Sequence, residues 1–349
     1  MITPTDKPFI SIVVPCYNEE AILPGNLDTI INYMDERIDK YRWEIIIIND
    51  GSKDSTGEIA DNFSNQREEI RVIHHPVNLN LGHALQTGFR HSKGDVIVVL
   101  DVDLSYGVKY IGEMVDKLID SVADIVIASP YMKGGKVTAV PFLRKTMSRW
   151  VNRFMRLAAQ DNYYTFTSMV RAYRRSFIQT LNLKTKDYEI SPEIIYKAMI
   201  LRARIIEIPA HLDWTEQNKF AGKRTSSLRV LRSFFSGLMS GFIFRPYLFF
   251  IGIGLFLMLL SLYELVWLLY DTLSYIGTNS DHSFSQSLAV QFQKNPQSFL
   301  VGGITFIIAI QFLSVGFLSL QSKRYFEELF HLGTSLKKDK AKAENLLNN

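Results

Sequence analysis

The sequence predicts an α/β domain built on a doubly wound parallel sheet, followed by two transmembrane helices. Two observations carry this prediction: apolar β-branched segments alternate with amphipathic ones up to about Arg245, and two long apolar segments dominate the rest of the chain. Continuous apolar strands separated by helices are typical of a parallel sheet that is covered on both faces. With 349 residues, the chain is long enough for one large or two modest domains.

Five apolar segments are predicted to be strands, and the segments between them have helical spacing. The strand segments are FISIVVP (9–15), WEIIIIND (43–50), IRVIHH (70–75), DVIVVLD (95–101) and DIVIAS (124–129), and the helical ones are 22–41, 56–66, 84–91 and 108–121. Ligands of such sheets bind beyond the carboxyl ends of the strands. We therefore expect the functional site where these strands end.

Polar clusters follow four of the predicted strands: PCYNEE, NDGSKDST, NLNLGHA and DVD. Each cluster alone is compatible with ordinary turn and helix-cap chemistry, but four along one sheet edge indicate a ligand. In the last of them, Asp101 and Asp103 would point to the same face of an extended strand. Their carboxylates would repel each other unless a cation lay between them.

Several other site classes are not indicated. The first strand is not followed by G-x-G-x-x-G, and the chain has no P-loop, no Cys/His cluster with zinc spacing and no G-x-S-x-G elbow. His74 and His75 would point to opposite faces of a strand, which argues against a shared metal. The single cysteine, Cys16, fits a reducing compartment and a packing role. The net charge of +4 is modest and its basic residues gather at the membrane edge, so no nucleic-acid partner is expected.

Two uninterrupted apolar segments, 246–270 and 298–320, are each long enough to cross a hydrocarbon core of ~30 Å. A buried core hairpin is the alternative. Basic residues precede the first segment and follow the second, whereas the connecting loop holds Lys294 alone. The positive-inside rule then places both termini and the first domain in the cytoplasm, and we expect a bacterial inner membrane.

The remaining segments complete the expected organisation. We expect a catalytic domain over 1–225, an amphipathic helix in the membrane interface over 226–245, a transmembrane region over 246–320 and a cytoplasmic basic tail over 321–349. Small residues in the two apolar segments permit close helix approach, so a homo-oligomer is expected. They are Gly252, Gly254, Gly302, Gly303 and Gly316.

The polar clusters taken together resemble the inverting family 2 glycosyltransferases with the GT-A fold. The matching motifs are P-x-Y-N-E (15–19), N-D-G-S (49–52), N-x-G (80–82), and G-D (94–95) running to D-x-D (101–103), in the family's order. The resemblance covers about 9–228. Within the family it is strongest to the polyprenyl-phosphate sugar transferases, which include dolichyl-phosphate mannosyltransferase and membrane-anchored bacterial glucosyltransferases.

The resemblance implies a metal site and two substrate sites. Asp101 and Asp103 would hold Mg²⁺ or Mn²⁺ together with the donor's diphosphate. The nucleotide-sugar site would comprise Pro15, Tyr17, Glu19, Asp50, Gly82, His83, Asp101 and Arg224. The acceptor phosphate would be held by Arg144, Ser148, Arg149 and Arg171. Alternatives stay open: the arginines facing lipid headgroups, Arg171 bracing a strand, and His83 in a surface or capping role.

Glu189 and Glu193 are the remaining catalytic candidates. In relatives with hydroxyl acceptors, an acid near this position deprotonates the nucleophile. A phosphate monoester is already largely a dianion at neutral pH, because its second pKa is about 6. These acids would then bind sugar hydroxyls, or simply lie at a helix N-terminus. The nearby stretch departs from the family pattern, with Thr165 in place of an acid and Met169 in place of glycine, so it does not indicate the sugar.

The resemblance implies transfer of a hexose from a nucleotide sugar to polyprenyl phosphate, with UDP-glucose as the first choice of donor. GDP-mannose is the first alternative. Two further alternatives are transfer to a hydroxyl of a glycolipid or polysaccharide and an inactive membrane scaffold.

Overall fold

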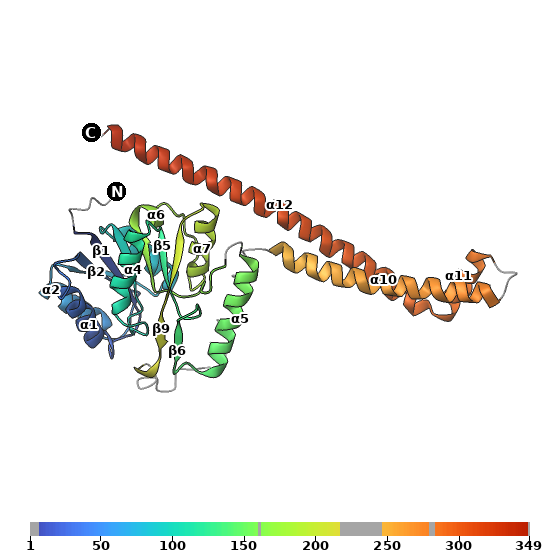
Figure 1. The fold of residues 1–349 in the computed structure, drawn as a ribbon, viewed down its shortest axis with the longest axis horizontal. Coiled ribbons are helices and arrows are strands. Elements are labelled where there is room, and N and C mark those ends of the chain that lie inside the picture. Colours follow the sequence, from blue (N-terminus) through green and yellow to red (C-terminus); the bar gives the residue numbers. More distant parts are fainter. Residues whose placement is uncertain (1–6, 160–161, 217–245, 279–282, 348–349) are drawn as a thin grey trace. The chain divides into compact units, whose positions relative to one another are not determined.

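The computed structural model describes residues 7–159, 162–216, 246–278 and 283–347. It divides into two compact units, one formed by Met1–Phe244 with His331–Asn349 and the other by Arg245–Phe330. The first unit is built on a seven-stranded sheet with the order β3-β2-β1-β4-β7-β5-β8 (Figure 1). Its strands are β1 (Phe9–Cys16), β2 (Arg42–Asn49), β3 (Ile70–His74), β4 (Val96–Val99), β5 (Ile125–Ser129), β7 (Arg171–Arg174) and β8 (Ile205–Pro209).

The central strands are buried at successive residues. Every residue of β4 and β5 is buried, as are most of β1 and all but the first of β2. Successive side chains of a strand point to opposite faces, so both faces of the sheet are covered. The helices that alternate with these strands are α1 (Leu23–Asp35), α2 (Thr56–Gln66), α3 (Leu81–His91) and α4 (Lys109–Asp120). The predicted α/β architecture is confirmed.

Strand β7 differs from the parallel sheet that the sequence predicts. It runs antiparallel to both of its neighbours, with Val99 opposite Arg171 on one side and Ile127 opposite Arg171 on the other. Its four residues, RAYR, contain two arginines, so no apolar run marks them as a central strand. A further pair, β6 (Lys136–Thr138) and β9 (His211–Asp213), forms a separate two-stranded parallel sheet.

Three more helices complete the first unit up to residue 216. They are α5 (Phe142–Ala158), α6 (Arg175–Ile178) and α7 (Ile190–Ile200). Helix α3 begins three residues earlier than predicted, directly after Asn80, whose φ of 71° ends the preceding loop. Helix α1 ends at Asp35, before the end of its predicted range at 41.

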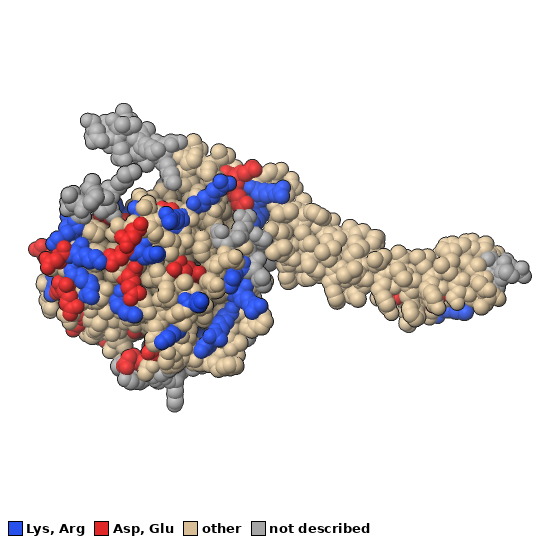
Figure 2. Space-filling view, viewed as in Figure 1, with Lys and Arg blue, Asp and Glu red and all other residues tan. Residues whose placement is uncertain are grey.

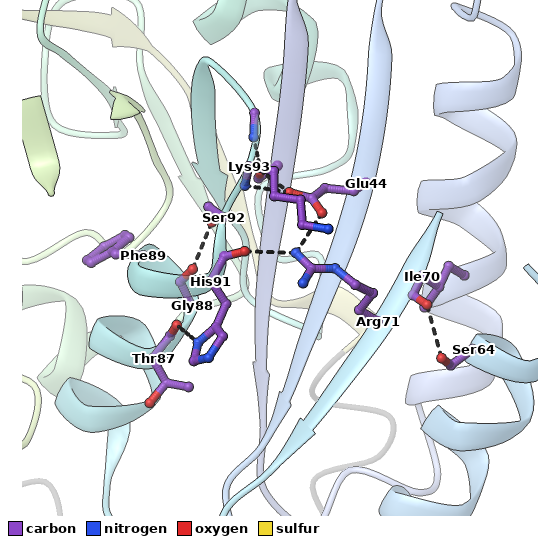
Figure 3. Close-up of polar contacts among 12 residues, drawn as sticks. Glu44, Ser64, Ile70, Arg71, Thr87, Gly88, Phe89, His91, Ser92 and Lys93 are labelled. Carbon is purple, nitrogen blue, oxygen red and sulfur yellow. Dashed lines mark hydrogen bonds and ion pairs between the residues drawn. The ribbon is translucent and has the colours of Figure 1, made fainter. Parts of the chain in front are cut away.

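A buried ion pair stabilises the edge of the sheet where β1 and β2 begin. Glu44 of β2 accepts hydrogen bonds from the backbone N–H of Lys93 at 2.7 Å and from Arg71 Nη2 at 2.7 Å (Figure 3). It also accepts one from the hydroxyl of Ser11. Although burial raises the pKa of Glu44, these hydrogen bonds and the Arg71 charge hold it below its ordinary value. The cluster ties β1, β2, β3 and the start of β4 together, away from the strand ends where ligands are expected.

The second unit contains two long apolar helices and a short polar one between them. They are α10 (Pro246–Thr278), α11 (Phe284–Lys294) and α12 (Pro296–Leu347), the last of which continues into the first unit. Among the described residues, Pro246–Thr278 and Pro296–Leu336 are long and apolar enough to cross a membrane. Only 11% of the most apolar window in each is buried, which argues against the alternative of a core hairpin. Figure 2 shows few charged side chains on the drawn face of this unit.

The predicted tail over 321–349 is a helical continuation of α12 as far as Leu347. The predicted interfacial helix over 226–245 lies outside the described residues.

Small residues let α10 and α12 approach each other. A Cβ atom at Gly254, Gly302 or Gly316 would lie 2.8, 3.3 or 2.6 Å from a side-chain atom of the other helix. Ser261 Oγ of α10 also donates to the Gly302 carbonyl at 3.0 Å. A Cβ at Gly252 or Gly303 would meet nothing within 4 Å. Three of the five predicted small residues therefore serve packing within the chain, and the predicted homo-oligomer stays a prediction.

Candidate active site

The ends of four parallel strands meet at one edge of the sheet. Cys16, the last residue of β1, is opposite Asn49, and Asn49 is in turn opposite His74 at the end of β3. The last residue of β4, Val99, is opposite Val13 of β1. The polar clusters that follow these strands are therefore neighbours, as the sequence predicts.

The loops after β1 and β2 hold each other in place. The backbone N–H of Asn18 donates to Ser52 Oγ at 3.0 Å, and the N–H of Lys53 donates to Asn18 Oδ1 at 2.8 Å. The N–H of Glu19 donates to Thr56 Oγ1 at 2.8 Å. The predicted residues Pro15, Tyr17 and Glu19 thus share one surface with N-D-G-S. Of these three, the side chain of Tyr17 is the most open to solvent.

The Asp50 carboxylate ties the end of β2 to the segment that follows β3. Its Oδ1 accepts from the N–H of Leu79 at 3.0 Å and lies 2.6 Å from Nδ1 of His75. Its own N–H donates to the carbonyl of Cys16 at 2.9 Å. The next residue, Gly51, has a φ of +67°, and a Cβ there would lie 2.3 Å from the Val77 carbonyl carbon. Glycine is therefore required for the close approach of these two loops.

Asp101 and Asp103 lie in the turn after β4, not on the strand. The strand ends at Val99, and the N–H of Leu104 donates to the Asp101 carbonyl at 3.1 Å. The predicted strand over 95–101 is therefore too long, because Leu104 takes a left-handed φ of 48° and the chain turns there. Ser105 N–H donates to Asp103 Oδ1 at 2.9 Å, which fixes the second carboxylate.

The two carboxylates are close enough to perturb each other. Burial and then the charge of Asp103 raise the pKa of Asp101 well above its ordinary value. Burial also raises the pKa of Asp103, against the hydrogen bonds from Ser105. Arg144 lowers the pKa of both, and Glu19 raises that of Asp101, so the segments that follow β1 and β4 come together with α5 here.

The acidic pair fits a hard divalent cation. One or two carboxylates are the usual protein share of a Mg²⁺ site, in which phosphate oxygens and waters complete the shell, and these two half-buried carboxylates repel each other without a cation. Among the described residues no group of three or more His, Cys, Asp or Glu side chains is arranged to hold a metal by itself. A cation at Asp101 and Asp103 would therefore depend on ligands from a substrate.

Three of the four predicted acceptor residues gather on α5 beside the acidic pair. The hydroxyl of Tyr131 donates to Ser148 Oγ at 2.8 Å. Burial raises the pKa of Tyr131, while the nearby charges of Arg149 and Arg144 oppose that shift. The guanidinium of Arg144 lies over the ring of Trp214, 4.2 Å from its centroid. Two arginines, two hydroxyls and two carboxylates thus form one polar cluster.

Residues 11–181 match the model of the family described as Glycosyl transferase family 2. This span contains every strand-end motif described above. The chain carries a family 2 glycosyltransferase domain.

Curated relatives match the same part of the chain. A dolichyl-phosphate beta-glucosyltransferase of Trichomonas vaginalis is 29% identical over 216 residues, which cover 60% of this chain and 66% of the relative. A dolichol-phosphate mannosyltransferase of Pyrococcus furiosus is 30% identical over 205 residues, covering 57% of this chain and 55% of the relative. The chain thus spans less than two thirds of the length of these relatives.

A solved structure supports the fold. It is glucosyl-3-phosphoglycerate synthase from Mycobacterium tuberculosis, in complex with Mn²⁺, UDP and glucosyl-3-phosphoglycerate. The TM-score is 0.50 at 18% identity, and the match covers 67% of this chain and 80% of that chain. The sheet of the first unit is therefore the GT-A sheet of the glycosyltransferase family, as the motifs imply.

Arg171, the fourth predicted acceptor residue, lies in the interior of the domain. Its side chain is fully buried, with Nη1 donating to the Ser191 carbonyl at 2.8 Å and Nη2 to the Phe166 carbonyl at 2.7 Å. These bonds direct the guanidinium into the interior, and the predicted phosphate contact stays a prediction that they do not support. The alternative that Arg171 braces β7 agrees with the structure.

Glu193 is also committed elsewhere. Its carboxylate accepts from the N–H groups of Lys184 and Thr185, both at 2.9 Å, and pairs with Lys197. Although burial raises the pKa of Glu193, these hydrogen bonds hold it below its ordinary value. The carboxylate therefore anchors the 184–185 segment, and the predicted catalytic role stays a prediction. Glu189 lies half-buried at the start of α7, and its role stays a prediction.

Gly82 and His83 serve the start of α3. A Cβ at Gly82 would lie 2.4 Å from the Thr185 carbonyl oxygen, and its N–H donates to the Lys186 carbonyl at 2.9 Å. Gly82 therefore packs closely against the 185–187 segment, and the predicted nucleotide contact stays a prediction. His83 Nδ1 bonds the Leu79 carbonyl at 2.8 Å, which is the capping alternative. The remaining donor candidate, Arg224, lies outside the described residues.

Three residues of the site were not predicted from the sequence. Tyr131 and Trp214 are single aromatic residues outside any motif, so their contacts with Ser148 and Arg144 depend on the tertiary fold. The position of His75 directly after a strand was a signal for a site residue. Beside His74, however, it was considered only as a possible metal ligand and not as a partner of Asp50.

Proposed function

We propose that this protein transfers a hexose from a nucleotide sugar to polyprenyl phosphate at the cytoplasmic face of a membrane, with inversion and with a divalent cation. The observation that carries the proposal is the half-buried pair Asp101 and Asp103, whose charges interact with that of Arg144, in a chain with two helices long enough to cross a membrane. The names of the curated relatives, a dolichyl-phosphate glucosyltransferase and a dolichol-phosphate mannosyltransferase, support a lipid phosphate acceptor.

The donor site follows from the interlocked loops. Pro15, Tyr17, Glu19 and Asp50 belong to the strand ends and loops of this sheet edge and would receive the nucleoside. Asp101 and Asp103 would hold Mg²⁺ or Mn²⁺ on the donor's diphosphate. When bound, that cation offsets the negative charge that develops on the departing nucleoside diphosphate.

The acceptor site follows from α5. Arg144 and Arg149 would hold the lipid phosphate, because a guanidinium donates two parallel hydrogen bonds to such a group. The phosphate oxygen attacks the anomeric carbon opposite the leaving group and inverts it. A phosphate monoester is largely dianionic at neutral pH, so this attack needs no general base. The hydrogen bonds of Glu193 to the 184–185 segment agree with a mechanism that has no general base.

Helix α5 also supports a lipid-borne acceptor. Its large apolar side chains point outward, and Phe142 and Trp150 are 84% and 64% exposed. Leu143 and Phe154 are exposed with them, at helical spacing. Basic residues lie between them at Lys145, Arg149, Arg153 and Arg156, and Figure 2 shows basic side chains over this part of the surface. An apolar face flanked by cations is typical of a helix in the interface of an anionic membrane.

The donor proposed first is UDP-glucose, and GDP-mannose is the alternative. Both sugars occur in the names of the relatives, and no residue described here discriminates between them. A scaffold without activity is disfavoured by the acidic pair and by the arginines that face it. Transfer to a sugar hydroxyl would need a base, for which Glu189 is the remaining candidate.

The test is a transfer assay with the full chain in lipid vesicles containing polyprenyl phosphate. Labelled UDP-glucose and GDP-mannose are supplied separately with Mg²⁺ or Mn²⁺, and the matched control contains polyprenol without the phosphate. We expect lipid-linked product with one donor, only with the phosphorylated lipid and only with the cation. Product from polyprenol, or the absence of product with either donor, would contradict the proposal.

A further inference from the structure

His75 lies between two side chains that belong to different elements. It follows β3 directly, and its backbone N–H donates to the Asn49 carbonyl at 2.9 Å. Its ring Nδ1 lies 2.6 Å from Asp50 Oδ1, and its Nε2 lies 3.0 Å from the hydroxyl oxygen of Thr87 on α3. The side chains of His75 and Asp50 are only 9% and 6% exposed. The ring is thus held at both nitrogens and cannot turn without losing both contacts.

This arrangement fixes the orientation of the Asp50 carboxylate. An ionised carboxylate only accepts hydrogen bonds, so Nδ1 of His75 is the donor, and Thr87 can donate to or accept from Nε2. Asp50 Oδ1 takes both this bond and the one from the Leu79 N–H. The other oxygen, Oδ2, receives no hydrogen bond from the part of the chain that the structure describes. It can accept from an N–H or O–H group of a ligand.

The neighbouring His74 contacts Asn49 and Asp61 and not Asp50. Its Nδ1 lies 2.9 Å from the Asn49 amide nitrogen and its Nε2 3.0 Å from Asp61 Oδ1. Asn49 Oδ1 accepts from the Ser52 N–H at 3.1 Å, so the amide of Asn49 is used within the turn. The two histidines thus hold two adjacent residues of the N-D-G-S turn from opposite faces of the strand. Only the one that His75 holds keeps an oxygen for a ligand.

We propose that His75 is a positioning residue for the donor substrate. It holds Asp50 so that Oδ2 accepts a hydrogen bond from the nucleoside, whose base N–H and ribose O–H groups are donors of the right kind. This inference rests on the proposed function, because it takes Asp50 to face the nucleotide sugar. The contact lies in the nucleoside part, away from the reacting carbon. It therefore contributes to donor binding and not to the chemical step.

Two substitutions of His75 separate its two contacts. In His75→Asn the side-chain amide lies where Nδ1 was and can still donate to Asp50, whereas in His75→Gln it reaches the position of Nε2 and the Asp50 contact is lost. A hydrogen bond to a charged group is worth about 1.5–3 kcal/mol, and each 1.4 kcal/mol is a factor of ten. We expect His75→Gln to raise the donor KM about tenfold or more with kcat within about twofold, and His75→Asn to restore most of the affinity.

The control is His91→Asn, the same substitution at an exposed histidine on the helix that carries Thr87. It should leave KM and kcat unchanged. A second pair of variants keeps the test valid if the His75 variants fold poorly. Thr87→Val removes the partner of Nε2 and should raise the donor KM, whereas Thr87→Ser keeps the hydroxyl and should not. Thermal unfolding of each variant shows whether it is folded.

Asp50→Asn separates this inference from the proposed function. If Asp50→Asn raises the donor KM while His75→Gln and Thr87→Val behave as wild type, the positioning role is overturned and the donor site stands. An equal rise in the donor KM of His75→Asn and His75→Gln also overturns it, because a hydrogen-bond donor at the Nδ1 position then makes no difference to donor binding. If neither Asp50 nor His75 variants change the donor KM, Asp50 does not contact the donor, and this part of the proposed function fails as well.

Discussion

At the scale of the residue, the acidic pair explains why an apolar strand leads into two carboxylates. Asp101 and Asp103 lie half-buried and close together, and the pKa of each lies above its ordinary value of about 4. A raised pKa means that the folded protein holds protons that the unfolded chain has released. The folded state without a cation therefore loses stability as the pH rises from the ordinary pKa towards the raised one.

A divalent cation should reverse this loss. Binding to the ionised pair stabilises the folded protein, and the pair is ionised only at higher pH. We predict that the increase in melting temperature caused by Mg²⁺ or Mn²⁺ grows as the pH is raised from about 5 to about 8, the value to which the pKa of Asp101 is raised. The measurement is thermal unfolding at each pH with and without the cation. An increase of the same size at every pH, or one that persists in Asp101→Asn/Asp103→Asn, would contradict the assignment.

The residues that sequence reasoning placed correctly belong to motifs. Asp50, Asp101 and Asp103 follow apolar strands directly, so the sheet alone brings them to one edge. The contacts that Arg171 and Glu193 make were not predicted, because they include backbone groups that no sequence pattern reveals. Trp214 was missed for a related reason, since its contact with Arg144 joins residues 70 positions apart.

At the scale of the element, the prediction succeeded where burial sets the pattern. Strands β1, β2 and β5 are continuous apolar runs, and their bounds agree with the sequence to within one residue. It failed at β7, which is short and polar, and at the end of β4, where a left-handed Leu104 turns the chain. Such turns depend on the local backbone and are not visible in hydrophobic periodicity.

The contact between β9 and α5 yields a prediction about the acceptor. Trp214 follows β9 directly, and its ring supports the guanidinium of Arg144. A cation over an aromatic ring contributes about 0.5–2 kcal/mol. We predict that Trp214→Leu raises the KM for polyprenyl phosphate roughly three- to tenfold, while Trp214→Phe, which keeps a ring, restores most of it. The donor KM, measured in the same assay, should not change. A rise in the donor KM without a rise in the KM for polyprenyl phosphate would refute the role of this contact.

The Glu44 cluster yields a prediction about stability. Its hydrogen bonds hold the pKa of Glu44 below its ordinary value, so its contribution is present above that ordinary value and is lost as the pH falls through the lowered one. We predict that Glu44→Gln lowers the unfolding free energy of the first unit by about 2 kcal/mol at pH 7. The deficit should shrink in acid. Denaturant unfolding at several pH values measures it, and a deficit independent of pH would show that the charge is not responsible.

At the scale of the whole molecule, the chain joins a family 2 glycosyltransferase domain to helices that can cross a membrane. This organisation was predictable, because a membrane span requires about 20 apolar residues in succession and few soluble segments meet that requirement. The outward apolar face of α5 was not predicted as membrane-facing, since its exposure is a property of the fold. The orientation of the chain and the sugar remain predictions.

The central claim is that Asp101 and Asp103 seat the cation that links donor and protein beside a lipid acceptor. The most direct measurement is the rate of sugar transfer to polyprenyl phosphate in vesicles by the full chain and by Asp101→Asn and Asp103→Asn, each verified as folded by thermal unfolding. We predict that either substitution lowers the rate about a hundredfold or more. Transfer by both variants at the rate of the unaltered protein would contradict the account.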